Sequence, residues 1–122
     1  MIYGSLGYLL IVKAKETGNF DEAIAFNTEA MEYDDDDAVV LDNMGQLYLA
    51  MGERGKAYEY FRRAHERKPH QVDTLYYLGR MSLEDGEKEK AKEYLSRAIE
   101  GNYTALCTTE RAQAQELLNS IG

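Results

Sequence analysis

The 122-residue sequence repeats itself every 34 residues. Three columns of small residues share this period, and each column holds one residue type at three positions. They are Gly18, Gly52 and Gly86, then Ala23, Ala57 and Ala91, then Ala30, Ala64 and Ala98. A repeat of about 20–50 residues indicates stacked units, because one such unit cannot bury its apolar face alone. The period therefore constrains the chain to a repetitive stack.

Within one period, the apolar residues follow the spacing of two helices. In residues 38–51, apolar side chains recur at steps of three and four, which places them on one helical face. Residues 54–67 follow the same rule with Ala57, Phe61 and Ala64. Gly52 lies between the two segments, where a positive φ would close the turn. The alanine columns would let antiparallel helices approach to about 8–10 Å.

The middle copy carries the most complete pattern, with apolar, small and proline residues at characteristic intervals. It reads Leu41, Met44, Gly45, Tyr48, Gly52, Ala57, Phe61, Ala64 and Pro69. This pattern resembles the tetratricopeptide repeat (TPR) family. The third copy departs from it at Ser82, where the family usually has an aromatic residue, and at Tyr103, where it often has proline. The resemblance covers about residues 4–105 and implies an all-α fold, a right-handed α-solenoid of antiparallel helix pairs.

The resemblance divides residues 1–122 into a single TPR domain with three repeats and a terminal helix. The repeats span about residues 4–37, 38–71 and 72–105, and the terminal helix spans about residues 108–120. Thr108 or Thr109 is the expected N-cap of that helix. In the first copy, a Leu6–Gly7 pair lies four residues earlier than the frame predicts. Because four residues make about one helical turn, we expect a lengthened first helix from about Ile2 to Thr17.

This first helix is expected to be apolar over most of its circumference. The residues responsible are Leu6, Leu9, Leu10, Ile11 and Val12. A helix that is apolar all round is normally covered on both sides. Either the chain is the end of a longer array, or this helix pairs with something else. Self-association through Leu6, Leu9 and Val12, giving a homo-oligomer, is therefore the alternative function.

Charge and composition restrict the class of partner. The chain has 14 Lys and Arg against 22 Asp and Glu, a net charge of −8. We expect no nucleic acid and no membrane as partner, because both would require positive charge on the protein. Apolar runs such as Leu9 to Val12 are far shorter than the ~20 residues of a membrane span. With no signal peptide and a single cysteine, Cys107, we expect a cytoplasmic protein with a reduced thiol.

No constellation for catalysis or metal binding stands out. The acidic run Asp34–Asp37 has two interpretations: a Ca²⁺ or Mg²⁺ site, or a solvated loop whose last residue caps the next helix. The absence of EF-hand spacing favours the second. His65 and His70 supply two ligands without a third. No nucleophile elbow, phosphate loop or dinucleotide fingerprint is present. We therefore predict that the chain is not an enzyme and has no cofactor and no metal.

The resemblance to TPR proteins implies a concave groove lined by the first helix of each pair. Carried over position by position, the groove residues proposed to bind a partner are Tyr8, Lys15, Asp42, Asn43, Gln46, Tyr76, Tyr77 and Arg80. Tyrosine rings stack, amides bond a peptide backbone, and Arg80 can bind a carboxylate. We expect a non-catalytic protein-interaction module, a scaffold or adaptor that binds a peptide or helix of another protein. The alternative for these residues is ordinary solvated helix surface.

One TPR subfamily holds the C-terminal carboxylate of chaperones in a clamp of Lys, Asn and Arg side chains. The matching positions here are Tyr8, Val12, Asn43, Asp73 and Tyr77, and only Asn43 fits the clamp. Asp73 would repel a carboxylate. We therefore expect no binding of chaperone tails in that manner.

Overall fold

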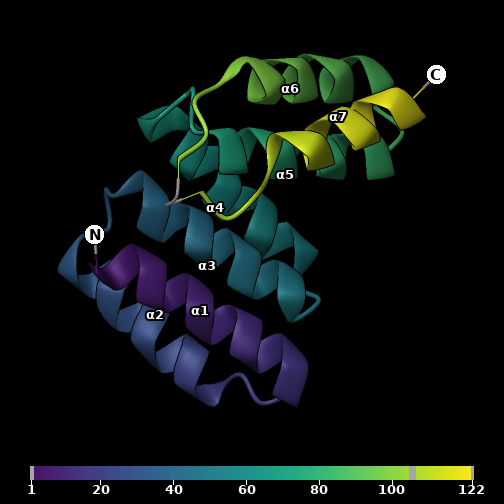
Figure 1. The fold of residues 1–122 in the computed structure, drawn as a ribbon. Coiled ribbons are helices and arrows are strands. Elements are labelled where there is room, and N and C mark those ends of the chain that lie inside the picture. Colours follow the sequence, from purple (N-terminus) through teal and green to yellow (C-terminus); the bar gives the residue numbers. More distant parts are fainter. Residues whose placement is uncertain (1, 105–106, 122) are drawn as a thin grey trace. The chain divides into compact units, whose positions relative to one another are not determined.

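A computed structural model describes residues 2–104 and 107–121, and these residues form helices and no strands (Figure 1). The helices in chain order are α1 (Ile2–Thr17), α2 (Asp21–Tyr33), α3 (Ala38–Ala50), α4 (Arg54–Arg67), α5 (Val72–Glu84), α6 (Lys88–Glu100) and α7 (Arg111–Ser120). The predicted all-α fold is confirmed. So is the lengthened first helix, which spans the expected residues. The repeat boundaries and the right-handed winding of a stack stay predictions.

Helices α1 to α6 form three antiparallel pairs, and each pair is closed by one glycine of the 34-residue column. Gly18, Gly52 and Gly86 have φ values of 79°, 83° and 80°. No other residue among those described has a positive φ. Residues with a side chain rarely adopt a positive φ, whereas glycine adopts one at little cost. The turns predicted from the repeat are therefore confirmed.

Each pair is also held by a glycine of its first helix that faces a side chain of its second. A Cβ atom on Gly45 would lie 2.7 Å from the ring of Phe61, and one on Gly79 would lie 2.8 Å from Leu95. In the first pair the glycine is Gly7, whose Cβ would lie 2.4 Å from Oδ1 of Asn27. Gly7 stands one turn before the position that the 34-residue frame assigns to it. This confirms that the first helix keeps its contact face after the shift.

The chain forms two compact units, with the boundary between Arg67 and Lys68. In the N-terminal unit, α1 lies against α2 and α3, and α3 lies against α4. Ile11, Ala14, Ala23 and Leu47 form one buried cluster there, with Leu10, Phe20 and Met51 at its edge. All six alanines of the two repeat columns are buried. Small side chains thus occupy buried positions of the helix pairs, as the sequence predicts.

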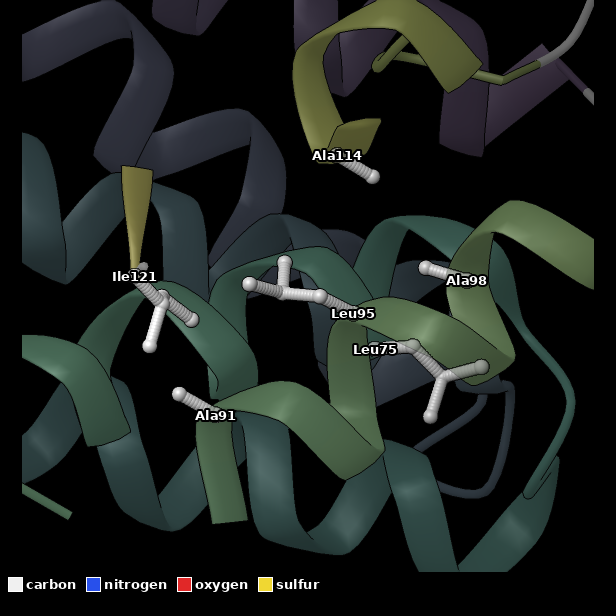
Figure 2. Packing of buried hydrophobic residues seen from close by; sticks show 6 residues of the cluster. All are labelled: Leu75, Ala91, Leu95, Ala98, Ala114 and Ile121. Carbon is white, nitrogen blue, oxygen red and sulfur yellow. The ribbon is translucent and has the colours of Figure 1, made fainter. Parts of the chain in front are cut away.

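The C-terminal unit contains α5, α6 and α7, and α7 lies against α6. Its core consists of Leu75, Ala91, Leu95, Ala98, Ala114 and Ile121, and Figure 2 shows these side chains gathered in one cluster. The predicted terminal helix is present, but its N-cap is Glu110 rather than Thr108 or Thr109. Glu110 and Gln113 form a reciprocal capping box. The Thr109 hydroxyl instead donates a hydrogen bond to Asp73 Oδ1.

The glycine contact inside the second pair can be tested with two alanine substitutions in the N-terminal unit. Gly45→Ala places a methyl group against Phe61 and should destabilise the protein by about 1–3 kcal/mol. Gly55→Ala is the matched control, because a Cβ there meets no atom within 4 Å. It should be neutral or stabilise by up to about 1 kcal/mol. Urea unfolding followed by circular dichroism measures both, and equal stability of the two variants would contradict the contact.

Candidate partner-binding surfaces

Three predicted groove residues, Tyr76, Tyr77 and Arg80, lie together on α5. Steps of three and four residues place them on one side of the helix. The two rings meet edge to face, with their centroids 5.2 Å apart. Arg80 Nε lies 3.6 Å from Glu84 Oε2. All three groove side chains are half-buried, and Tyr76 also packs against the core cluster of its unit. The surface offered by α5 is therefore mainly Tyr77 and Arg80.

Asp73 lies one turn before Tyr77 on the same helix, and its carboxylate binds the loop that leads into α7. Its Oδ2 accepts a hydrogen bond from the backbone N–H of Thr108 at 2.9 Å. Its Oδ1 accepts from the N–H of Thr109 at 3.0 Å and from the Thr109 hydroxyl at 2.6 Å. Hydrogen bonds to a charged acceptor are stronger than neutral ones. Asp73 therefore anchors the residues that lead into α7, and its carboxylate is occupied by these hydrogen bonds.

The three predicted groove residues of α3 are buried. Asp42, Asn43 and Gln46 are 3%, 2% and 6% exposed. Gln46 Nε2 donates to Asp42 Oδ1 at 2.6 Å. A partner that approaches this structure cannot touch buried side chains, so the structure does not offer them as a lining. Their part in partner binding stays a prediction.

The remaining candidates lie on α1, and they divide between two sides of that helix. Tyr8 and Val12 are half-buried and Lys15 is exposed, with the steps of four and three that place them on one side. Leu6 and Leu9 are 40% and 59% exposed. At about 100° per residue, Val12 lies roughly 120° around the helix from Leu6. Tyr8 and Lys15 thus belong to one surface, and Leu6 and Leu9 to another.

The acidic run between α2 and α3 is accounted for by contacts within the N-terminal unit. Asp37 Oδ1 accepts a hydrogen bond from the N–H of Val39 at 2.8 Å, so it caps α3 as predicted. Asp36 forms an ion pair with Arg67 at 2.8 Å. Asp34 Oδ1 accepts from the N–H of Asp36 at 3.0 Å. Among the residues described, no group of three or more His, Cys, Asp and Glu is placed to hold a metal ion.

Cys107, the single cysteine of the sequence, precedes α7. It is half-buried in the loop before α7, and its Sγ accepts from the N–H of Thr104 at 3.4 Å. Nearby, Arg111 lies 4.9 Å from the centroid of the Tyr103 ring. Burial raises the pKa of Tyr103 above its ordinary value, and the positive charge of Arg111 opposes that rise. These contacts join Thr104 to Cys107 and Tyr103 to Arg111, and they assemble no reactive group among the described residues.

One aromatic contact between α3 and α4 was not predicted from the sequence, and both of its rings are half-buried. The Tyr48 and Tyr60 rings stack with centroids 5.5 Å apart and planes inclined by 6°. Lys56 Nζ lies 5.3 Å from the Tyr48 ring, and the Arg63 guanidinium lies 5.2 Å from the Tyr60 ring. The stack joins α3 to α4. Residues on two helices share no periodicity, so only the fold reveals the contact.

Comparison with known proteins agrees with these helix pairs. Residues 48–104 match the model of the tetratricopeptide repeat family. The chain contains tetratricopeptide repeats. Among solved structures, it is similar to SycD, the type III secretion translocator chaperone of Yersinia enterocolitica, with a TM-score of 0.70 and 17% identity. The match covers 95% of this chain and 81% of SycD, and it concerns the fold. A search of curated protein sequences gives no match.

In the described part of this TPR chain, no helix is long and apolar enough to cross a membrane.

The anchor between α5 and α7 can be tested with a charge-matched pair of substitutions. Asp73→Asn keeps the shape of the side chain but weakens three hydrogen bonds, and it should destabilise the C-terminal unit by about 1.5–3 kcal/mol. Glu93→Gln removes the same charge from an exposed position on α6 and should cost less than about 0.5 kcal/mol. Amide hydrogen exchange of α7 measures the difference. Unchanged protection of α7 in the Asp73 variant would contradict the anchoring role.

Proposed function

We propose that this TPR protein is a non-catalytic scaffold or adaptor that binds a peptide or helix of another protein. The observation that carries the proposal is the Tyr77–Arg80 surface of α5. An aromatic ring and a guanidinium lie there on one side of the helix, three residues apart along the chain. Tyrosine and arginine are among the residue types that are enriched at the energetic centre of protein interfaces. The TPR family, which implies protein binding, supports this proposal.

The chemistry of this surface favours an extended or helical segment with an acidic or carbonyl group near an apolar residue. The ring of Tyr77 offers an apolar face to stack on, and Arg80 offers several N–H donors. Glu84 is the present partner of Arg80, and both side chains are exposed by more than 40%. An exposed ion pair of this kind contributes little to stability. Arg80 can therefore exchange Glu84 for a group of the partner at small cost.

The similarity to SycD supports a protein as the partner of this chain. SycD is a chaperone of translocator proteins, so a protein client is bound by a chain of similar fold. We propose that this chain also binds a protein, and we do not assign to it the translocators that SycD binds. A cytoplasmic location, and the absence of nucleic acid and membrane as partners, remain predictions from the charge and the single cysteine.

Binding can be tested with peptides selected on the wild-type chain from a random display library. The double substitution Tyr77→Ala with Arg80→Ala should raise the Kd of such peptides at least about tenfold, which corresponds to ~1.4 kcal/mol. Tyr76 is left unchanged because it also packs against the core. Fluorescence anisotropy of the labelled peptides gives the Kd values.

The control is Tyr58→Ala with Arg62→Ala on α4. Tyr58 is 46% exposed, and Arg62 pairs with Glu66 four residues on, as Arg80 pairs with Glu84. This variant removes the same two side chains from another helix and should leave the Kd unchanged. An equal loss in both variants would contradict the α5 surface. So would a library that yields no binding peptide.

A further inference from the structure

We propose that a second copy of this chain docks on the exposed side of α1. In this dimer, Leu9 of each copy enters the hollow between α1 and α2 of the other copy. The interface uses neither Tyr77 nor Arg80. It therefore provides a second interaction surface, independent of the proposed peptide site on α5.

The projecting part of the interface is the pair Leu6 and Leu9. They are 40% and 59% exposed, and Leu9 is the most exposed leucine among the large apolar residues of the described chain. Three residues separate them, so their side chains lie on neighbouring positions of one helix face. Leaving two leucines side by side in water is unfavourable, and burial against an apolar surface removes that cost.

The receiving part is a hollow of about 200 Å³ at the seam of α1 and α2. Leu10, Ala14 and Ala23 supply its apolar lining, and its polar lining consists of Lys13, Thr17, Asn19 and Glu22. An apolar cavity of about 150 Å³ already accepts a benzene molecule, so this hollow has room for a leucine side chain. Ala14 and Ala23 are small, which is why space remains between the helices at this point. The hollow thus fits the side chain that projects from the same helix.

Charge favours a second copy as the occupant. Lys13 and Glu22 line the same hollow and pair with each other at 3.5 Å, with exposures of 64% and 67%. A surface that carries one positive and one negative charge can face itself, because Lys13 of each copy then meets Glu22 of the other. Most acids of residues 4–37 lie on α2 and in the loop after it. The sequence of α1 contains Lys13 and Lys15 against Glu16 alone, so two copies repel each other least there.

The positions of the two features suit a closed dimer. Leu9 and Lys13 are about one helical turn apart, so the projecting leucine and the hollow are neighbours on α1. A two-fold axis that passes between them exchanges both contacts at once, and such an isologous interface closes after two copies. Val12 lies about 60° around α1 from Leu9, toward Tyr8. We therefore place Val12 outside the centre of this interface, and its predicted part in self-association stays untested.

Sedimentation velocity over a concentration series of the full chain tests the dimer. The wild type should pass from monomer to dimer as concentration rises, and Leu9→Glu should raise the dissociation constant at least tenfold. Ile24→Glu is the matched control, because Ile24 is 39% exposed and does not line the hollow. It should leave the dissociation constant unchanged. A constant monomer mass for the wild type, or equal behaviour of the two variants, would overturn the proposal.

A second experiment separates contact between copies from an effect on folding. Lys13→Glu alone and Glu22→Lys alone should each weaken the dimer, since like charges then face each other. An equimolar mixture of the two variants should restore it, because each Lys13→Glu chain meets a Glu22→Lys chain with opposite charges at both contacts. A variant that fails to fold cannot be rescued by mixing. Mixing that restores no dimer would therefore overturn the pairing of Lys13 with Glu22 across the axis.

Discussion

The close approach of two helices at a glycine governs the architecture of this protein. Gly7, Gly45 and Gly79 each leave space for one side chain of the following helix, and a methyl group at any of them would come within 3 Å of it. Protein interiors are packed as densely as organic crystals, so such a contact fixes the distance between the helices. It also fixes their rotation. In α1, α3 and α5, the side of the helix that carries the glycine faces the second helix of the pair. The other sides of these helices are available for other contacts.

Those other sides have diverged among the three first helices. Helix α5 presents Tyr77 and Arg80, whereas α3 has its polar residues buried. Helix α1 keeps Leu6 and Leu9 exposed. A repeat protein can vary these surfaces freely, because the contacts that define the fold lie elsewhere on each helix. One architecture thus supports two proposed surfaces of different chemistry, one for a peptide and one for a second copy.

The repeat alone predicted the helices, because period, turn glycines and alanine columns all describe contacts within a pair. The bounds of α1 and the cap at Asp37 followed from local rules. The cap of α7 did not, since Thr109 is held by Asp73, which lies 36 residues away in sequence. Burial of Asp42 and Gln46 was missed for a similar reason. The groove positions were taken from the family pattern. That pattern gives the place of each residue in the repeat, but it does not give the burial or the contacts of its side chain.

Asn27 gives the first helix pair a different stability from the other two. Phe61 and Leu95 fill the space beside their glycines with apolar atoms, whereas Asn27 brings an amide that is 1% exposed. Its Nδ2 donates to the carbonyls of Gly7 and Ala23 at 3.3 and 2.8 Å, but its Oδ1 has no hydrogen-bond partner among the described residues. A buried acceptor without a partner costs about 1–3 kcal/mol. Local opening should therefore begin between α1 and α2, and a ligand that binds only the closed pair would lower the fraction of open molecules by mass action.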